Sequence, residues 1–552
     1  MKNIINKKVV AFLAASVALL ASCSKDYLNT SPTNSVGAGT AVATYESAIG
    51  ALNGIALSMC SQQYMASQGF AGENAIIRLY ENYPSQDYNY NQYASGWADI
   101  HNQTMHTDKN TRYNYYAWYY YYNLIGQANS ILANIDESSA TDDEKSFIKA
   151  SALTFRAYSY QKLLLYYCPR WMDSNNGTSA EGKTLVLRLD ESTGDQAPST
   201  MAEVYTQIYA DCEEAIKLFK ESGLDRKSGL VWHTNINVAH AVYARAALNR
   251  LDYATAQNHA KQARDGYPLV KGSAYNDGFM RPNSEWIMGS YGDATENQWY
   301  WSYGTQFSCN GYYASNTANG GGSISIELTN QIPDNDVRKA LFLTPDKFSN
   351  YKPESVGTAF YYLGLGQVGN AVNIIDAALY NEVEAYIKNV AVKGVAAPLG
   401  AGYYHLGDHL KFYVFDTPGV SYLPFIRSSE MVLIEAEAAF KQGKENEAQA
   451  ALVELNASTG RTPGYTCTKT GDDLWTEIMN YRGIELWGEG FEWSDFKRWK
   501  RPIVRKTFAN GSNAHSAVAI TIGVNDVNNW TWVVPQLETD YNKGFDTSKP
   551  EA

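Results

Sequence analysis

Aromatic side chains gather beside amides and carboxylates in two stretches of this 552-residue chain. A flat aromatic ring can stack on the apolar C–H face of a sugar, and each stack contributes about 0.5–1.5 kcal/mol beyond area burial. Neighbouring polar side chains can bond the hydroxyl groups. These residue types therefore favour weak, reversible binding of a sugar-like ligand. The candidate contact residues are Tyr83, Tyr88, Trp97, Asp99, Trp299, Trp301, Tyr303 and Tyr312.

Trp97 is the first candidate, because the loop around it is rich in Gly, Asn and Gln and has no helical period. In the second stretch Trp299, Trp301 and Tyr303 alternate, so on a strand they would share one face. That face either meets a ligand or covers the scaffold. Trp286, inside an apolar strand-like run, is predicted to lie in the core.

The run 113–122 holds a dense set of tyrosines. On a helix these rings would surround the axis, so at most a third could meet one ligand. Packing between helices is the prediction for this run.

Two acid pairs suggest carboxylate chemistry. Glu435 and Glu437 are two residues apart, which points them to different faces of a helix. Glu485 and Glu489 share a face, but an ion-pair network with nearby cations such as Arg482 and Lys497 explains them. The sequence therefore predicts a protein that is not an enzyme.

Three other motifs have ordinary structural explanations. His405 and His409 have a metal-ligand spacing, but Gly402, Gly407 and Asp408 disfavour a long helix there. The segment 334–336 is oxygen-rich without fitting an EF-hand, so a structural Ca²⁺ is a weak alternative to no cofactor. The motif GLGQVG (364–369) lacks the βαβ context of a dinucleotide fingerprint, and a glycine turn is predicted.

The scaffold that must position these residues is predicted to be mostly α-helical. Helical periods run from about Thr44 to Met59 and over 115–135 and 142–167, and another follows a cap at Ser199 or Thr200. The stretch 68–100 is predicted to be a loop. Between 270 and 426 helical periods are scarce and short β-like runs appear at 284–290, 323–328 and 411–415.

An internal repeat relates 239–268 to 430–456 at a shift of 192 residues. Two helices joined by a tight turn and packed on small residues make a tetratricopeptide-like unit, which buries its face only by stacking on neighbours. Two further copies are suspected at 115–167 and 200–222. The matched positions are Ala246, Ala247, Ala256, Ala260 and Ala263 against Ala438, Ala439, Ala448, Leu452 and Leu455.

The N-terminus is predicted to be a secretory signal peptide. Lys2, Lys7 and Lys8 precede an apolar run of thirteen residues, which is too short to span a bilayer. Leu20-Ala21-Ser22-Cys23 resembles the lipobox of bacterial lipoproteins. The resemblance implies cleavage after residue 22 and acylation of Cys23, with palmitate as one acyl group. Several acyl chains anchor stably. The alternative is an ordinary signal with an incidental cysteine.

The charge balance excludes some partners. Three of the 45 basic residues and none of the 57 acidic ones precede Cys23, which leaves the rest of the chain at a formal charge of −15. Nucleic-acid binding needs a basic stripe, so it is disfavoured. No long apolar run follows the signal, so membrane attachment would be by lipid alone. The five cysteines after Cys23 contain no CxxC pair, although one or two disulfides stay open.

Several landmarks together resemble the SusD/RagB family of outer-membrane nutrient-binding lipoproteins. They include the opening Cys23-Ser24-Lys25-Asp26, the helix at 148–171 and the stretch YRGIELWGEGFEWSDFKRW at 481–499. Cys168 stands where the family usually has Gly. Trp97 resembles a tryptophan of the family, but Ile100 replaces the asparagine of its starch-binding branch, which argues against starch itself.

The resemblance implies a domain plan and a partner. Residues 1–22 would be the signal, 23–40 a lipidated tether and 41–552 one domain. Its tetratricopeptide-like repeats, about 41–268 and 427–500, would face the partner, and the insertion at about 270–426 would carry the ligand site. The partner would be a SusC-like TonB-dependent transporter, and the ligand an oligosaccharide captured outside the cell at the outer membrane. A peptide-binding lipoprotein, a surface glycoside hydrolase and a purely structural module are the alternatives.

Overall fold

The computed structural model describes residues 38–61, 70–90, 97–291, 304, 307–309, 322–357, 361–368, 371–388, 403–413, 422–526 and 530–545. The protein is mostly α-helical, as the sequence predicts. The helices in the N-terminal half are α2 (Ala38–Ala41), α3 (Tyr45–Ser58), α4 (Glu73–Ala75), α5 (Ala98–His101), α6 (Arg112–Asn134), α7 (Asp142–Tyr167), α8 (Met201–Ser222), α9 (Ile236–Asn249) and α10 (Tyr253–Ala263). Those in the C-terminal half are α12 (Ile326–Thr329), α13 (Ala377–Tyr386), α14 (Ser428–Lys441), α15 (Glu445–Val453), α16 (Gly471–Leu486), α17 (Glu492–Trp499) and α19 (Gln536–Tyr541).

The long helices begin and end where the sequence indicates. Thr141 and Thr200 cap α7 and α8, and each forms a capping box with the glutamate three residues on. α7 ends at Tyr167, two residues before Pro169. The first helix that the structure describes is α2, which begins at Ala38, inside the predicted tether.

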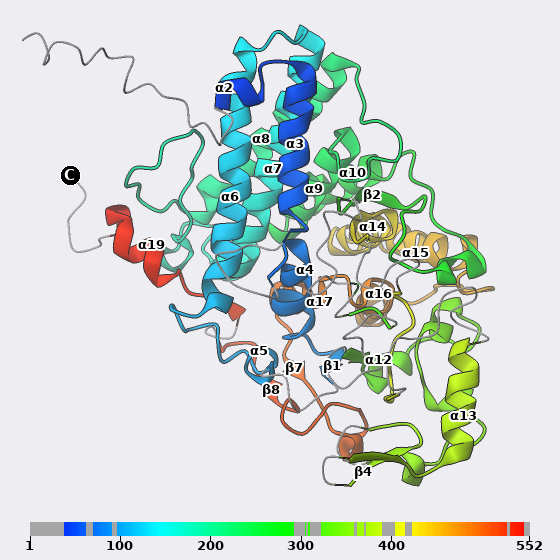
Figure 1. Ribbon diagram of the computed structural model, residues 1–552. Coiled ribbons are helices and arrows are strands. Elements are labelled where there is room, and N and C mark those ends of the chain that lie inside the picture. Colours follow the sequence, from blue (N-terminus) through cyan, green and yellow to red (C-terminus); the bar gives the residue numbers. More distant parts are fainter. Residues whose placement is uncertain are drawn as a thin grey trace, which may run out of the picture.

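The internal repeat is confirmed as two helix pairs. α9 and α10 form one pair, and α14 and α15 form the other. All ten matched small or leucine positions are buried. α10 packs directly on α14, so the two pairs stack although 192 residues separate them in sequence. In Figure 1 they continue the row that α6, α7 and α8 begin.

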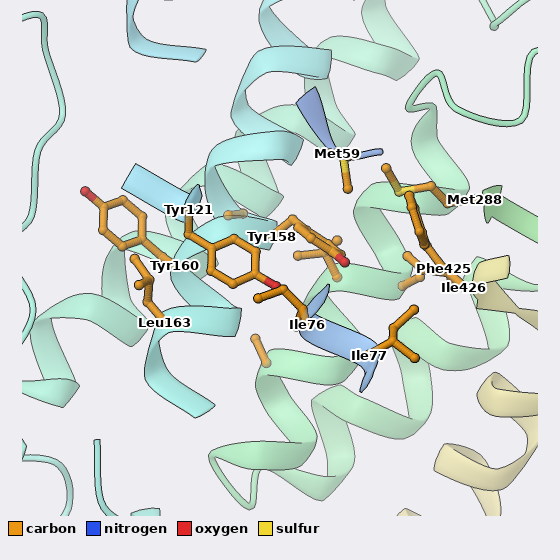
Figure 2. Packing of buried hydrophobic residues seen from close by; sticks show 14 of the residues in the cluster. Met59, Ile76, Ile77, Tyr121, Tyr158, Tyr160, Leu163, Met288, Phe425 and Ile426 are labelled. Carbon is orange, nitrogen blue, oxygen red and sulfur yellow. The ribbon is translucent and has the colours of Figure 1, made fainter. Parts of the chain in front are cut away.

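The tyrosine run packs the core, as predicted. Tyr116, Tyr120 and Tyr121 are buried on α6, and Tyr115 and Tyr119 are partly buried beside them. Figure 2 shows Tyr121 and Tyr158 lying close to Ile76, with Met288 and Phe425 on the far side of this packing. The core thus joins the helical rows to both ends of the insertion, near Met288 and Phe425.

The strands are short and pair two by two. β1 (Tyr88–Tyr90) pairs with β3 (Gly322–Ile324), and β2 (Trp286–Gly289) with β6 (Pro424–Arg427). β4 (Leu365–Val368) pairs with β5 (Ala371–Ile374), and β7 (Ile503–Val504) with β8 (Thr521–Ile522). All four pairs are antiparallel.

The insertion has its own hydrophobic cluster beneath α13. Leu379 and Val383 of α13 pack there with Leu363, Leu406 and Leu410. In Figure 1, α13 and β4 lie at the end of the molecule opposite α2. The insertion therefore extends from the helical rows and is stabilised by a hydrophobic cluster of its own.

Three predictions for local structure need correction. The predicted loop at 68–100 contains α4, α5, β1 and a π-helical turn at Ile76–Asn82, because its apolar residues are buried against α6 and α17. The predicted strand at 411–415 is absent at Lys411, Phe412 and Tyr413, and its last two residues lie outside the described part. The run at 323–328 is a strand only to Ile324 and then turns into α12.

Two further predictions have different outcomes. The predicted glycine turn is instead strand β4 over Leu365–Val368, which pairs with β5, and Gly364 directly before it has φ +72°. The core prediction for Trp286 is confirmed, since this residue is 1% exposed. In the described part of the chain, no helix has the length and apolar character that crossing a bilayer needs.

Candidate ligand-binding site

Trp97 lies half-buried at the start of the short helix α5. Its carbonyl accepts hydrogen bonds from Ile100 N and His101 N, at 3.0 and 3.1 Å. Its indole contacts Tyr83 and Tyr113 at ring-centroid distances of 5.7 and 5.8 Å. The ring is thus fixed on one side by protein and leaves part of its surface open.

Arg78 lies directly behind this indole, and sequence reasoning missed it. Its Cζ is 6.0 Å from the ring centroids of both Tyr83 and Trp97, within cation–π range. The side chain is 0% exposed, and none of its three guanidinium nitrogens has a hydrogen-bond partner in the described structure. An arginine inside the apolar run 75–80 was the signal that could have found it.

Asp99 is exposed on the same short helix. Its Oδ1 accepts a hydrogen bond from the Thr104 hydroxyl at 3.3 Å. Ile100, which follows it, is buried. Trp97 and Asp99 therefore provide one ring and one carboxylate within three residues of the chain, at the start of α5.

Tyr83 and Tyr88 lie in the core, only 3% and 1% exposed. Both were candidate contacts, and their burial assigns them to packing behind Trp97 instead. Tyr83 stacks on His101 at 4.8 Å, and Tyr88 stacks on Trp487 at 5.8 Å. An aromatic stack thus leads from Trp97 into the core.

The fold places Tyr88 and β1 beside described residues that follow the second predicted aromatic stretch in the sequence. The Tyr88 ring stacks on Phe307 at 5.6 Å, and β1 pairs with β3 so that Tyr90 lies opposite Gly322. Only glycine fits there, because a Cβ at Gly322 would lie 1.9 Å from the Tyr88 ring. Residues 88–90 and the described residues Phe307 and 322–324 are therefore neighbours, although more than 200 positions separate them.

The remaining candidates lie outside the described residues. These are Trp299, Trp301, Tyr303 and Tyr312, and also the lipidation candidate Cys23.

The acidic residues of both pairs form ion pairs with cationic side chains. The sequence predicts such ion pairs for Glu485 and Glu489, but their partners differ from the predicted Arg482 and Lys497. Glu485 contacts Arg338, Arg427 and Arg461 at 2.9, 3.1 and 3.1 Å. Although burial opposes ionisation, these cations hold the pKa of Glu485 well below its usual value. Glu489 pairs with Arg427 and Lys411, each at 2.7 Å.

The cations expected beside this pair have other roles. Arg482 pairs with Asp495, and the Lys497 ammonium donates to the carbonyls of Leu165 and Cys168 at 2.6 Å. The other acid pair is divided: Glu435 pairs with Arg264 and Glu437 with Arg498. Each carboxylate in both pairs thus has a cationic partner that fixes it in the structure.

The metal-like motifs are also engaged by protein groups. The His405 ring lies 3.1 Å from an Asp408 oxygen, and His409 Nε2 lies 2.8 Å from the Phe307 carbonyl. Asp334 pairs with Lys339, and Asp336 with Arg338. Among the described residues, no three His, Cys, Asp or Glu side chains are grouped so as to hold a metal ion.

The row of tetratricopeptide-like helix pairs, with an insertion and a half-buried tryptophan, defines a helical-repeat scaffold with a candidate ligand site. Comparison with known families identifies this scaffold. A SusD-like family described as "Starch-binding associating with outer membrane" matches residues 12–248, and the SusD family matches residues 284–544. The chain belongs to the SusD/RagB family.

Solved structures share this fold along nearly the whole chain. A SusD-like carbohydrate binding protein from Bacteroides vulgatus is 20% identical, with a TM-score of 0.69, and the match covers 92% of this chain and 98% of that one. A SusD superfamily protein from Bacteroides thetaiotaomicron is 21% identical, with a TM-score of 0.63 and coverages of 91% and 98%. Another from B. vulgatus is 17% identical, with a TM-score of 0.65 and coverages of 90% and 97%. None of the curated proteins gives a significant match.

Proposed function

We propose that this protein is a non-catalytic, cell-surface glycan-binding lipoprotein that captures oligosaccharides and delivers them to a TonB-dependent transporter in the outer membrane. The family is associated with carbohydrate binding at that membrane. The observation that carries the proposal is Trp97, whose indole is braced by Tyr83, Tyr113 and Arg78 and remains half-exposed. A braced, open ring is a stacking surface for a sugar.

The second half of the binding surface is proposed to come from Trp299, Trp301, Tyr303 and Tyr312. The contact of Tyr88 with Phe307 and the pairing of β1 with β3 support this, because Phe307 and β3 are close in sequence to these four residues. Two or three stacked rings would bind weakly enough to release the ligand. Release is necessary for delivery to a partner.

Anchoring is proposed through acylated Cys23, with the body facing the cell exterior. The family's association with the outer membrane supports this location. The stacked helix pairs α9–α10 and α14–α15 are the proposed surface for the SusC-like transporter. No cofactor is needed for this function.

A peptide ligand is the second candidate, since Asp99 and the tyrosines would also suit a peptide. A surface glycoside hydrolase has less support, because each carboxylate of the two acid pairs is neutralised by a guanidinium or ammonium partner.

Retention in native gels that contain different polysaccharides tests the proposal. The wild-type protein is expected to be retarded by at least one polysaccharide, and Trp97→Ala and Trp301→Ala are expected to migrate freely. Tyr541→Ala is the matched control, because Tyr541 is an aromatic residue that is 79% exposed on α19. Unchanged retention of both tryptophan variants would show that the assignment is wrong, and retention only by immobilised peptides would favour the second candidate.

A further inference from the structure

A cavity of about 280 Å³ lies among α16, α17, α12 and the segment before β1. Figure 1 places these elements together at the centre of the molecule, between the helical rows and the insertion. Gln331 and Thr476 are exposed at its mouth, whereas Asn82 and Arg482 are buried at its floor. The cavity is near the lower end of the size range of small-ligand pockets, about 300 Å³.

The walls combine aromatic rings with a few polar groups, as ligand pockets do. Phe491, Phe496 and Trp499 provide flat or apolar surfaces, and Asn480 adds an amide. Aromatic rings of this kind suit the C–H face of one sugar ring.

Two arginines that line the cavity have guanidinium N–H groups that could bind a ligand. Arg482 is 4% exposed, and its Nε pairs with Asp495 at 2.5 Å while its Nη1 has no hydrogen-bond partner in the described structure. Arg501 is half-buried, stacks over Phe496 at 4.8 Å, and its Nη1 meets only the Met479 sulfur, at 3.5 Å, among described polar atoms. Guanidinium groups recognise carboxylates through paired N–H donors.

Four carboxyl groups also line the cavity, and each has a partner among the described residues; Asp87 accepts a hydrogen bond from the Ser325 hydroxyl. Glu327 pairs with Lys506, and Asp495 pairs with both Arg482 and Arg498. Glu492 accepts the Asp87 N–H on both oxygens at 3.1 Å. Burial and the neighbouring Asp87 carboxylate raise the pKa of Glu492 well above its usual value, which favours its neutral form.

A smaller cavity, of about 30 Å³, is also lined by Arg482. It has room for one water molecule, whose share of liquid volume is about 30 Å³. Arg501 does not line it, so Arg501 is the residue whose free donors point to a ligand in the larger cavity.

We infer that the cavity at α16 and α17 is a second binding site, which takes one monosaccharide that carries a carboxylate. The carboxylate lies against Arg501 and Arg482, and the sugar ring packs against Trp499 and Phe491. This site is separate from Trp97, and it holds a single sugar acid rather than a chain.

Titration calorimetry with D-glucuronate on the full chain tests this inference. Wild-type protein is expected to bind glucuronate at one site and to bind D-glucose at least about tenfold more weakly, because glucose lacks the carboxylate. Arg501→Gln is expected to weaken glucuronate binding at least about tenfold. Arg188→Gln, at a half-buried arginine remote from this cavity, is the matched control and is expected to bind like wild type.

Three outcomes would overturn the inference: no glucuronate binding by folded wild type, equal binding of glucose, or wild-type affinity in Arg501→Gln. Trp97→Ala separates this site from the proposed glycan site. It is expected to lose polysaccharide retention and to keep glucuronate binding. Loss of both in Trp97→Ala would place the sugar acid at Trp97 and overturn the second site.

Discussion

At the scale of single residues, the position of Trp97 depends on a buried cation behind it. Arg78 packs against two aromatic rings without a hydrogen-bonded anion in the described structure, an arrangement that leaves its desolvation uncompensated. Such an arginine stabilises the ring position rather than the fold. It links the core to the proposed binding edge.

This role makes a prediction for Arg78→Met, which keeps the length of the side chain and removes the charge. The free energy of unfolding is expected to stay unchanged or rise by up to about 2 kcal/mol, because a buried charge is removed. Glycan affinity is expected to fall, because the Trp97 ring loses its cation–π support. Chemical denaturation measures the first quantity and gel retention the second. A loss of more than 2 kcal/mol in stability would contradict this account of Arg78.

The burial of His106 predicts how the stability of the protein depends on pH. Burial lowers its pKa to about 3, and its ring stacks on Trp532 at 4.0 Å. Because the folded-state pKa is below the unfolded value of about 6.5, the stabilisation is present above pH 6.5 and is lost as the pH falls toward 3. Between pH 7 and pH 5, wild type should lose about 2 kcal/mol more than His106→Phe. Equal losses in urea titrations at the two pH values would refute the assignment.

At this scale the sequence predicts some contacts and misses others. The Gly- and Asn-rich surroundings of Trp97 correctly indicate a ring that is not fully buried. Tyr83 and Tyr88 have the same composition around them, yet they are buried because β1 pairs with a strand more than 200 residues away. Local composition does not contain that pairing.

At the scale of secondary-structure elements, the small residues of the repeat set how closely helices approach. Ala260 of α10 is fully buried in the main core, and α10 packs on α14. Ala254, on the same helix, is exposed. The buried alanines thus show which face of α10 packs against the neighbouring helices.

Ala260→Leu is therefore expected to lower the free energy of unfolding by about 1–3 kcal/mol, because the added carbons do not fit between the helices. Ala254→Leu adds the same atoms on the exposed face and is expected to change stability by less than about 0.5 kcal/mol. Thermal or urea denaturation distinguishes them. Equal effects of the two substitutions would show that α10 does not pack through its alanines.

Elements with strong local signals were predictable. Capping threonines, a 3.6-residue period and an internal repeat located α7, α8 and the two stacked pairs within a few residues. The structure of the segment 70–90 could not be predicted. Its π-helical turn depends on packing against α6 and α17 rather than on a hydrophobic period in its own sequence.

At the scale of the whole molecule, a buried ion network joins distant parts of the chain. Glu285 and Arg427 lie at the β2–β6 pair, Arg338 lies in the insertion, and Glu485 lies on α16. All four side chains are 2% exposed or less. The network therefore ties the insertion to the helical rows. The acids were visible in the sequence, but their partners are 58 to 147 residues away and could not be assigned from it.

Glu485→Gln tests this connection. It leaves Arg338, Arg427 and Arg461 with less compensating charge, so the free energy of unfolding is expected to fall by about 3–5 kcal/mol. Glu214→Gln removes an exposed partner of Lys217 on α8 and is expected to change it by less than about 1 kcal/mol. Comparable effects of the two substitutions in urea denaturation would mean that the network does not hold the insertion in place.

The whole-molecule account is that a helical scaffold presents a braced tryptophan edge to a surface glycan. Its most direct test is titration calorimetry of wild type, Trp97→Ala and Tyr541→Ala with the polysaccharide that gels identify as a ligand. The account predicts that Trp97→Ala raises Kd at least about tenfold, in line with one lost stacking contact and its buried area. Tyr541→Ala should match wild type. An unchanged Kd for Trp97→Ala, in a protein that remains folded, would contradict the account.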